Sequence, residues 1–130
     1  MDLSAADRVW NRAVLEGGGP NALLGDRALA DLMLLHGLAM NGGVLHALEC
    51  LDEKERDAAV AGYAFYAFPA VSLLLLDLLA RRSDDADADA ADALELVAAR
   101  EYAREIPSDQ VIADAFGRLL AERPELFAPL

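Results

Sequence analysis

The sequence predicts an all-α fold, a single compact bundle of about six to seven helices over residues 1–130. The chain is rich in Ala and Leu and poor in β-branched Thr and Ile, a composition that favours helix over sheet. Apolar residues also recur at helical spacing between stops made of Gly, Pro and Asn. Hydrophobic residues make up 55% of the chain, enough for a packed core.

The first two expected helices have clear start and stop signals. Ser4 to Asp7 resembles a capping box and begins a helix that Gly17-Gly18-Gly19-Pro20 ends. Asp26 is the expected N-cap of the next helix, which is apolar on most sides and therefore central. Asn41-Gly42-Gly43 stops that helix, because Asn and Gly tolerate the left-handed conformation common at helix C-termini.

Three further helices are expected in the middle of the chain. A short helix spans Val44 to Leu51. Asp52 caps the next helix, which continues to Ala67 until Phe68-Pro69 breaks it. The proline suits the first turn of a new helix that extends through Leu79.

The C-terminal third contains two more expected helices. The polar segment from Ser83 to Ala91 is expected to be a loop or a frayed helix start, and the helix after it ends at Pro107. One face of this helix comprises Leu94, Val97, Ala98, Tyr102 and Ile106. Ser108 or Asp109 caps the last helix, and Leu126-Phe127 packs behind it as a tail. The amphipathic stripe of the last helix comprises Val111, Ile112, Ala115, Phe116, Leu119 and Leu120.

The uncharged run over residues 58–76 has the length of a membrane span. Pro69 lies within it and Asp77 follows it, so two buried helices that meet at the proline explain the run better. The N-terminus lacks the basic and apolar regions of a secretory signal. Cys50 is the single cysteine, which excludes an internal disulfide and fits a reducing compartment. We therefore expect a cytoplasmic protein that binds no membrane.

The charge of the chain is strongly acidic. A net charge of −12 argues against direct binding to nucleic acid or anionic lipid and favours a basic protein partner. Between residues 84 and 114, ten acids accompany only two bases, Arg100 and Arg104. We expect this acidic surface to bind the partner, and its residues are Asp84, Asp85, Asp87, Asp89, Asp92, Glu95, Glu101, Glu105, Asp109 and Asp114.

Part of the acidic segment resembles a calcium-binding loop. Asp85, Asp87 and Asp89 match the first three ligand positions of an EF-hand. The sixth position is Ala90 instead of Gly, and the twelfth is Leu96 instead of Glu. We therefore expect no metal at this segment.

Catalytic and zinc-binding constellations are also incomplete. His46 and Cys50 share a helix face, but two ligands are too few for zinc, so a satisfied histidine and a small apolar cysteine are expected. His36 lies on an apolar helix face and is expected to be a hydrogen-bonded core residue, and Asp77 is expected to pair with Arg81. No serine or cysteine lies in a nucleophile elbow or beside a base. We expect neither an enzyme nor a cofactor.

Asn41-Gly42-Gly43 carries a resemblance to a known family. An apolar helix that runs into this motif, followed by a short apolar helix, an acidic cap and an Ala/Leu-rich helix pair, resembles a family of small all-helical bacterial proteins. That family has a domain of unknown function and includes a DNA-mimic protein. Trp10 and the segment Arg123 to Phe127 also resemble family features, whereas residues 44–48 depart from the aromatic residues and Gln that usually follow the glycines.

The resemblance implies a structural role for Asn41, Gly42 and Gly43 as a tight turn between helices. It also implies a non-enzymatic binder, because surface carboxylates in the DNA mimic imitate phosphates at the basic site of a DNA-binding protein.

We therefore expect an acidic protein-interaction module. It would be a DNA mimic or an inhibitor or immunity-type binder of a basic protein, such as a DNA-binding protein or a nuclease-like toxin. One alternative is a small-ligand-binding or enzymatic helical domain with a pocket near Asn41–His46 and His36. Another is a structural domain that forms a homo-oligomer through the apolar surplus of Ala58–Leu79.

Overall fold

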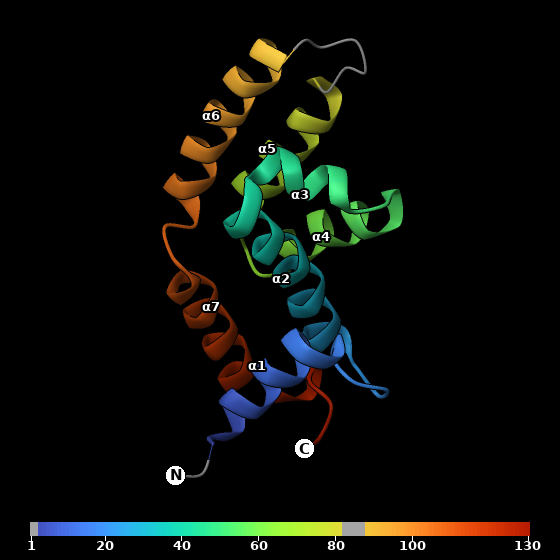
Figure 1. Cartoon of the computed structure of the whole chain (residues 1–130). Coiled ribbons are helices and arrows are strands. Elements are labelled where there is room, and N and C mark those ends of the chain that lie inside the picture. Colours follow the sequence, from blue (N-terminus) through green and yellow to red (C-terminus); the bar gives the residue numbers. More distant parts are fainter. Residues whose placement is uncertain (1–2, 82–87) are drawn as a thin grey trace.

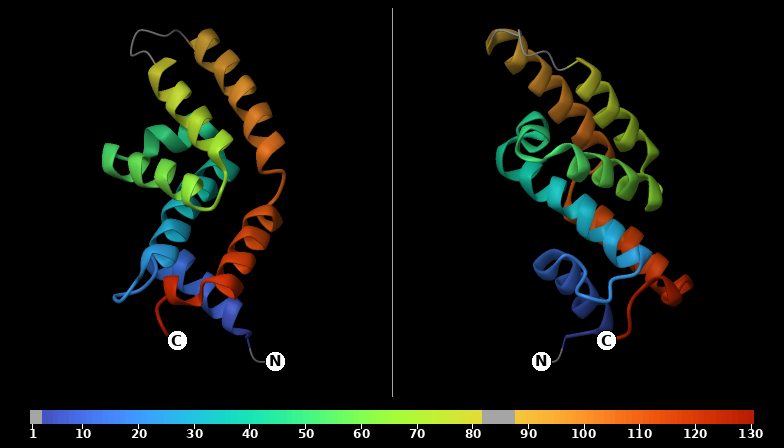
Figure 2. Two further views of the ribbon diagram at one scale, coloured as in Figure 1. Left: turned by 180° about the vertical axis from the view of Figure 1, so that it is seen from behind. Right: turned by 90° about the vertical axis from the view of Figure 1, so that its right-hand side faces the viewer.

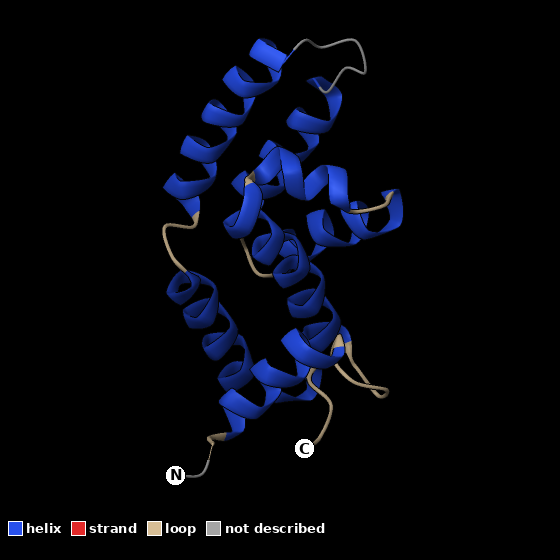
Figure 3. Ribbon diagram, in the orientation of Figure 1, coloured by secondary structure: helices blue, strands red, loops and turns tan. Residues whose placement is uncertain are grey.

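The computed structural model describes residues 3–81 and 88–130 and confirms the all-α fold. These residues form seven α-helices and one 3-10 turn, and none of them lies in a strand (Figure 3). The elements are α1 (Ala5–Glu16), α2 (Leu24–Gly42), α3 (Val44–Cys50), α4 (Glu53–Phe65), α5 (Pro69–Arg81), α6 (Ala88–Glu105), α7 (Asp109–Glu122) and η1 (Pro124–Leu126). The helices pack as the bundle that the sequence predicts.

The central helix α2 contacts α1, α3 and α4 (Figures 1 and 2). Its buried residues include Leu29, Leu32 and Leu35, all with no exposed surface. α4 lies very close to α2 because Gly62 has no side chain. A Cβ atom at Gly62 would lie 2.7 Å from the carbonyl oxygen of Ala28. The contact between α2 and α4 therefore depends on a glycine.

The capping box of α1 is confirmed. The Asp7 N–H donates to the Ser4 hydroxyl at 3.0 Å, and the Ser4 N–H donates to the Asp7 carboxylate at 3.3 Å. The helix ends at Gly17, whose φ of +62° lies in the left-handed region that glycine adopts without strain.

The prediction that Asp26 is the N-cap of α2 is wrong. Leu23 is the N-cap, and Asp26 is the third residue of the helix. The Leu23 N–H donates to Asp26 Oδ2 at 3.0 Å, so the carboxylate stabilises the helix start from within the first turn. The carboxylate is fully buried there because two other segments supply it with donors.

Those donors come from Arg12 and Ala128, and with Asp26 they form the Asp26 clamp. Arg12 Nη2 donates to Asp26 Oδ1 at 2.8 Å, and the Ala128 N–H donates to Asp26 Oδ2 at 2.7 Å. Arg12 Nη2 also lies 3.0 Å from the Ala128 carbonyl oxygen, which accepts a hydrogen bond from it. The clamp joins α1, α2 and the C-terminal tail, so α1 and this tail lie at one end of the molecule (Figure 1).

Helices α3 to α5 follow the predicted order. Asp52 caps α4 through a capping box with Glu55, and Pro69 is the first residue of α5, as predicted. Ala67 is not part of α4, contrary to the prediction. It lies in the turn between the helices with a φ of +64°, because the last turn of α4 closes through backbone bonds that reach Tyr66 and Phe68. None of the described helices combines the length and the apolar content that crossing a bilayer requires.

Helices α6 and α7 follow one another along one side of the molecule, with a bend at residues 106–108 (Figures 1 and 2). α6 begins at Ala88, so residues 88–91 of the expected loop or frayed start are helical, while residues 83–87 lie outside the described residues. Val97, expected on the inner face of α6, is about half exposed, because Ala98 and Tyr102 supply the buried face instead. Ser108 is the N-cap of α7.

Candidate functional site

The predicted acidic surface divides into three groups in the structure. Asp84, Asp85 and Asp87 lie outside the described residues. Four acids of α6 and α7 are exposed and have no ion pair with a described base, and we call them the acidic edge. The acidic edge comprises Asp89, Asp92, Glu105 and Asp114. The remaining three acids are engaged by other groups of the protein.

Glu101 and Asp114 have local partners. Arg104 Nη2 lies 3.2 Å from Glu101 Oε1, three residues away on α6. Gln110 donates an amide hydrogen bond to Asp114 at 2.7 Å, which leaves the charge of Asp114 uncompensated. One of the two bases in the segment is therefore paired, and it pairs with an acid outside the acidic edge.

Glu95 points inward instead of toward a partner. Its Oε2 accepts a hydrogen bond from the Leu45 N–H at 2.7 Å, at the start of α3. Its Oε1 is buried without a hydrogen-bond partner. A Cβ atom at Gly43 would lie 1.9 Å from that oxygen, and the φ of Gly43 is +99°. The residue after Gly42 must therefore be glycine both for its backbone and for the space that Glu95 occupies.

Asp109 belongs to a polar cluster that reaches into the core. His36 Nε2 lies 2.6 Å from Asp109 Oδ1, and His36 Nδ1 lies 2.6 Å from the Tyr102 hydroxyl. The Tyr102 hydroxyl lies 2.6 Å from that of Tyr63. His36, Tyr63 and Tyr102 are buried, whereas the side chain of Asp109 is 72% exposed. We call these four residues the His36 cluster.

The direction of the hydrogen bonds in the His36 cluster follows from the tautomer of His36. A carboxylate only accepts, so His36 donates its Nε2–H to Asp109, and in the tautomer with its one proton on Nε2 the ring accepts at Nδ1 from the Tyr102 hydroxyl. The Tyr102 oxygen then accepts from the Tyr63 hydroxyl. Every buried polar group in the cluster has a partner, so the prediction of a hydrogen-bonded core histidine is confirmed.

The tyrosines of the cluster are held in their neutral form. Burial is the main cause that raises the pKa values of Tyr63 and Tyr102 above their ordinary value. Sequence reasoning missed both hydroxyls as partners of His36. The available signal was that two tyrosines fall on apolar helix faces, where a buried hydroxyl needs a partner.

His46 and Cys50 are both exposed, and Cys50 Sγ lies 3.5 Å from His46 Nε2. The two share a helix face as expected, and this face lies at the surface where α3 ends. Among residues 3–81 and 88–130, no group of three His, Cys, Asp or Glu side chains is arranged to hold a metal ion. The expected pair of Asp77 and Arg81 is confirmed at 3.1 Å.

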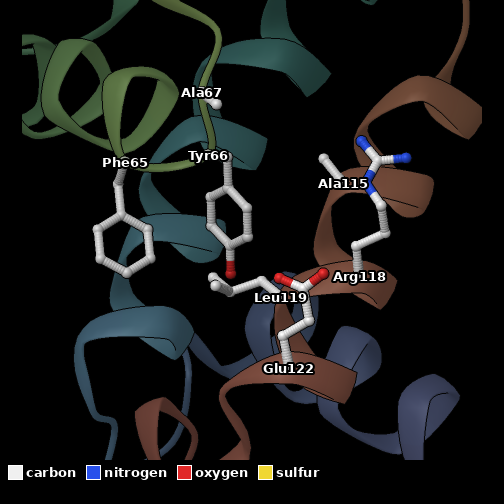
Figure 4. Close-up of a pocket in the computed structure, with 7 residues that line it drawn as sticks. All are labelled: Phe65, Tyr66, Ala67, Ala115, Arg118, Leu119 and Glu122. Carbon is white, nitrogen blue, oxygen red and sulfur yellow. The ribbon is translucent and has the colours of Figure 1, made fainter.

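A pocket of about 170 Å³ lies between the end of α4 and α7 (Figure 4). It is lined by Phe65, Tyr66, Ala67, Ala115, Arg118, Leu119 and Glu122. Tyr66 donates its hydroxyl hydrogen to the Gly25 carbonyl at 2.7 Å, and Arg118 and Glu122 are exposed. The lining therefore offers a ligand no buried polar group that is still unbonded.

No protein-family model matches the chain, and comparisons with curated proteins and with solved structures also found no match.

Proposed function

We propose that this chain is an acidic, non-enzymatic protein-interaction module that binds a basic protein through the acidic edge. The observation that carries the proposal is the exposure of Asp89, Asp92, Glu105 and Asp114 without a cationic partner among the described residues. Residues 88–122 contain eight acids and three arginines, so the excess of negative charge persists over both helices.

The acidic edge is carried by two long helices. α6 has 18 residues and α7 has 14, which corresponds to about 27 Å and about 21 Å of helix. One turn of a DNA duplex is about 34 Å long, so each helix covers more than half of it. Carboxylates along this length would occupy a basic DNA-binding site much as phosphates do, and would release the counterions of that site. The partner we propose is therefore a DNA-binding protein or a nuclease-like toxin.

The test compares two variants of equal net charge. The edge variant carries Asp89→Asn, Asp92→Asn, Glu105→Gln and Asp114→Asn. The control variant carries four matched changes at exposed acids elsewhere, namely Glu16→Gln, Glu49→Gln, Glu53→Gln and Asp57→Asn. Both lose the same charge, so a difference between them reports the location of the contact.

Proteins captured from the native cell at low and at high salt are identified first, and the dissociation constant of the purified partner is then measured. We expect a basic protein at low salt only, and binding about tenfold weaker for the edge variant than for the control variant. Release of the partner by duplex DNA identifies the mimic. Equal binding by the two variants, or affinity that is independent of salt, would refute the proposal.

Exposed apolar side chains favour self-association as a second candidate. Leu73 and Leu76 on α5 are 68% and 50% exposed, and Leu96 on α6 is 68% exposed. Sedimentation of the protein and of a Leu73→Gln, Leu76→Gln variant separates the cases. A mass that falls from dimer to monomer in the variant supports a homo-oligomer, and a monomeric parent excludes it.

A small-ligand-binding or enzymatic domain is the third candidate. Asn41 and His46 are exposed, whereas His36 is buried with both ring nitrogens bonded. A small molecule that co-purifies with the protein and is released by His46→Ala would favour this candidate over the other two.

A further inference from the structure

A second pocket, of about 290 Å³, lies where α1 crosses α7. Its lining combines one indole ring, one carboxylate and one helical glycine. The lining residues are Ala6, Asp7, Trp10, Ala113, Phe116 and Gly117. Gly117 lies one helical turn after Asp114, so the pocket adjoins the acidic edge.

The aromatic wall of the pocket is fixed from behind. The Trp10 and Phe116 ring centroids are 5.8 Å apart, and Phe116 in turn packs edge-on against Phe127 at 5.6 Å. Phe116 and Phe127 are buried, whereas Trp10 is only partly buried and lines the pocket. The indole ring is therefore fixed in place by packing and is accessible from the pocket.

Charge and space point to a cationic occupant. Asp7 is the one charged residue among the six that line the pocket. Its Oδ2 accepts from the Ser4 N–H, and its Oδ1 has no hydrogen bond within the described residues. A Cβ atom at Gly117 would meet nothing within 4 Å, so the glycine leaves room beside the indole.

We propose that this pocket takes an arginine side chain of the basic partner and so anchors it at the end of the acidic edge. The guanidinium stacks on Trp10 and donates hydrogen bonds to the free oxygen of Asp7. Trp and Arg are the residue types that most often dominate binding at protein interfaces. This inference rests on the proposed function, because it names how the partner of the acidic edge is held.

Trp10 is the only tryptophan of the chain, so its fluorescence reports on the pocket directly. The probe is a peptide of alternating arginine and serine, and the control peptide carries citrulline, a neutral isostere, in place of each arginine. We expect a saturable change in Trp10 emission with the arginine peptide and none with the citrulline peptide. No change with the arginine peptide, or the same change with both, overturns the anchor.

Two pocket variants keep the net charge of the acidic edge unchanged. Gly117→Leu fills the pocket, and Gly37→Leu is its matched control, because a Cβ atom at Gly37 on α2 also meets nothing within 4 Å. Asp7→Asn removes the carboxylate charge and keeps an oxygen for the Ser4 N–H. We expect Gly117→Leu and Asp7→Asn each to weaken binding of the arginine peptide roughly fivefold, and Gly37→Leu to leave its binding unchanged.

The same variants, measured against the captured partner, separate the two proposals. If the edge variant and Gly117→Leu each weaken binding of the partner, both proposals are supported. If only the edge variant weakens binding of the partner, the proposed function is supported and the arginine anchor is refuted. A partner that neither variant weakens refutes the proposed function, while the peptide titration still decides whether the pocket binds arginine.

Discussion

Helices α4 and α7 are held to the rest of the molecule in different ways. α4 lies against α2 at backbone distance, and Gly62 makes that approach possible. α7 is held through side chains instead, by Asp109 at its start and Phe116 in its middle. Gly117 on α7 faces open space, whereas Gly62 faces a carbonyl oxygen. The position of α4 therefore depends on close backbone packing. The position of α7 depends on a few side-chain contacts, which leave its solvent-exposed face free to carry charge.

Alkaline pH should have the largest effect, because it unfolds the packing around the buried tyrosines. Burial raises the pKa of Tyr63, Tyr66 and Tyr102, all the tyrosines of the chain, above the ordinary value of 10.0. The folded state then keeps protons that the unfolded chain loses, so this stabilisation is full below pH 10 and is lost as the pH rises through the folded pKa values. We expect complete unfolding in strong alkali, with helical circular dichroism and tyrosinate absorbance changing together. Tyrosinate that forms while the helices remain intact would contradict this expectation.

Substitution of the buried acid of the Asp26 clamp should be the most damaging single change. Asp26→Asn removes the charge partner of the partly buried Arg12 at a site where the carboxylate itself is fully buried, and we expect a cost of about 3–5 kcal/mol of unfolding free energy. The control is Asp77→Asn, because the exposed pair with Arg81 contributes roughly 1 kcal/mol or less. Urea denaturation measures both changes, and equal losses would show that the clamp is no stronger than a surface pair.

The His36 cluster joins α2 and α4 to α6 and α7. Loss of the hydroxyl of Tyr102, its middle tyrosine, should cost more stability than loss of the hydroxyl of Tyr63 at its end. Tyr102→Phe leaves both the Tyr63 hydroxyl and His36 Nδ1 without a partner, and we expect a loss of about 2–3 kcal/mol. Tyr63→Phe leaves only the Tyr102 oxygen without a donor, and we expect about 1 kcal/mol. A larger loss for Tyr63→Phe would contradict the central position of Tyr102 in the cluster, which holds for either direction of the hydrogen bonds.

Substitution of Gly62 and of Gly117 by alanine should change the free energy of unfolding in opposite directions. Gly62→Ala forces a methyl group against the Ala28 carbonyl, and we expect a loss of roughly 1–3 kcal/mol. Gly117→Ala has open space and a better helix former, and we expect a gain of roughly 0.5–1 kcal/mol. Thermal unfolding followed by circular dichroism gives both signs. Two losses would show that α7 is packed as tightly as α4.

The sequence predicts the helices because their signals are local. The boxes at Ser4 and Asp52, the stop at Gly43 and the break at Pro69 each depend on residues within a few positions. The prediction for Asp26 is wrong because two of its three donors come from residues 14 and 102 positions away, which no local pattern reveals.

The candidate sites show the same limit. The spacing of the acids puts Glu95 and Glu101 in one segment, but only the packing of α6 against α3 turns Glu95 inward. The pocket at Trp10 arises where α1 crosses α7, more than a hundred residues later in the chain. Its residues carry no joint signal in the sequence.

The Asp26 clamp also has a consequence for the order of folding. Asp26 and Ala128 are 102 residues apart, so during synthesis the Asp26 carboxylate receives this backbone donor only after the residues between them have been made. Until then it has one donor fewer and stays accessible to water. Closure of this end of the bundle is therefore a late event, and it follows the contacts between neighbouring helices that α2, α3 and α4 make as they emerge.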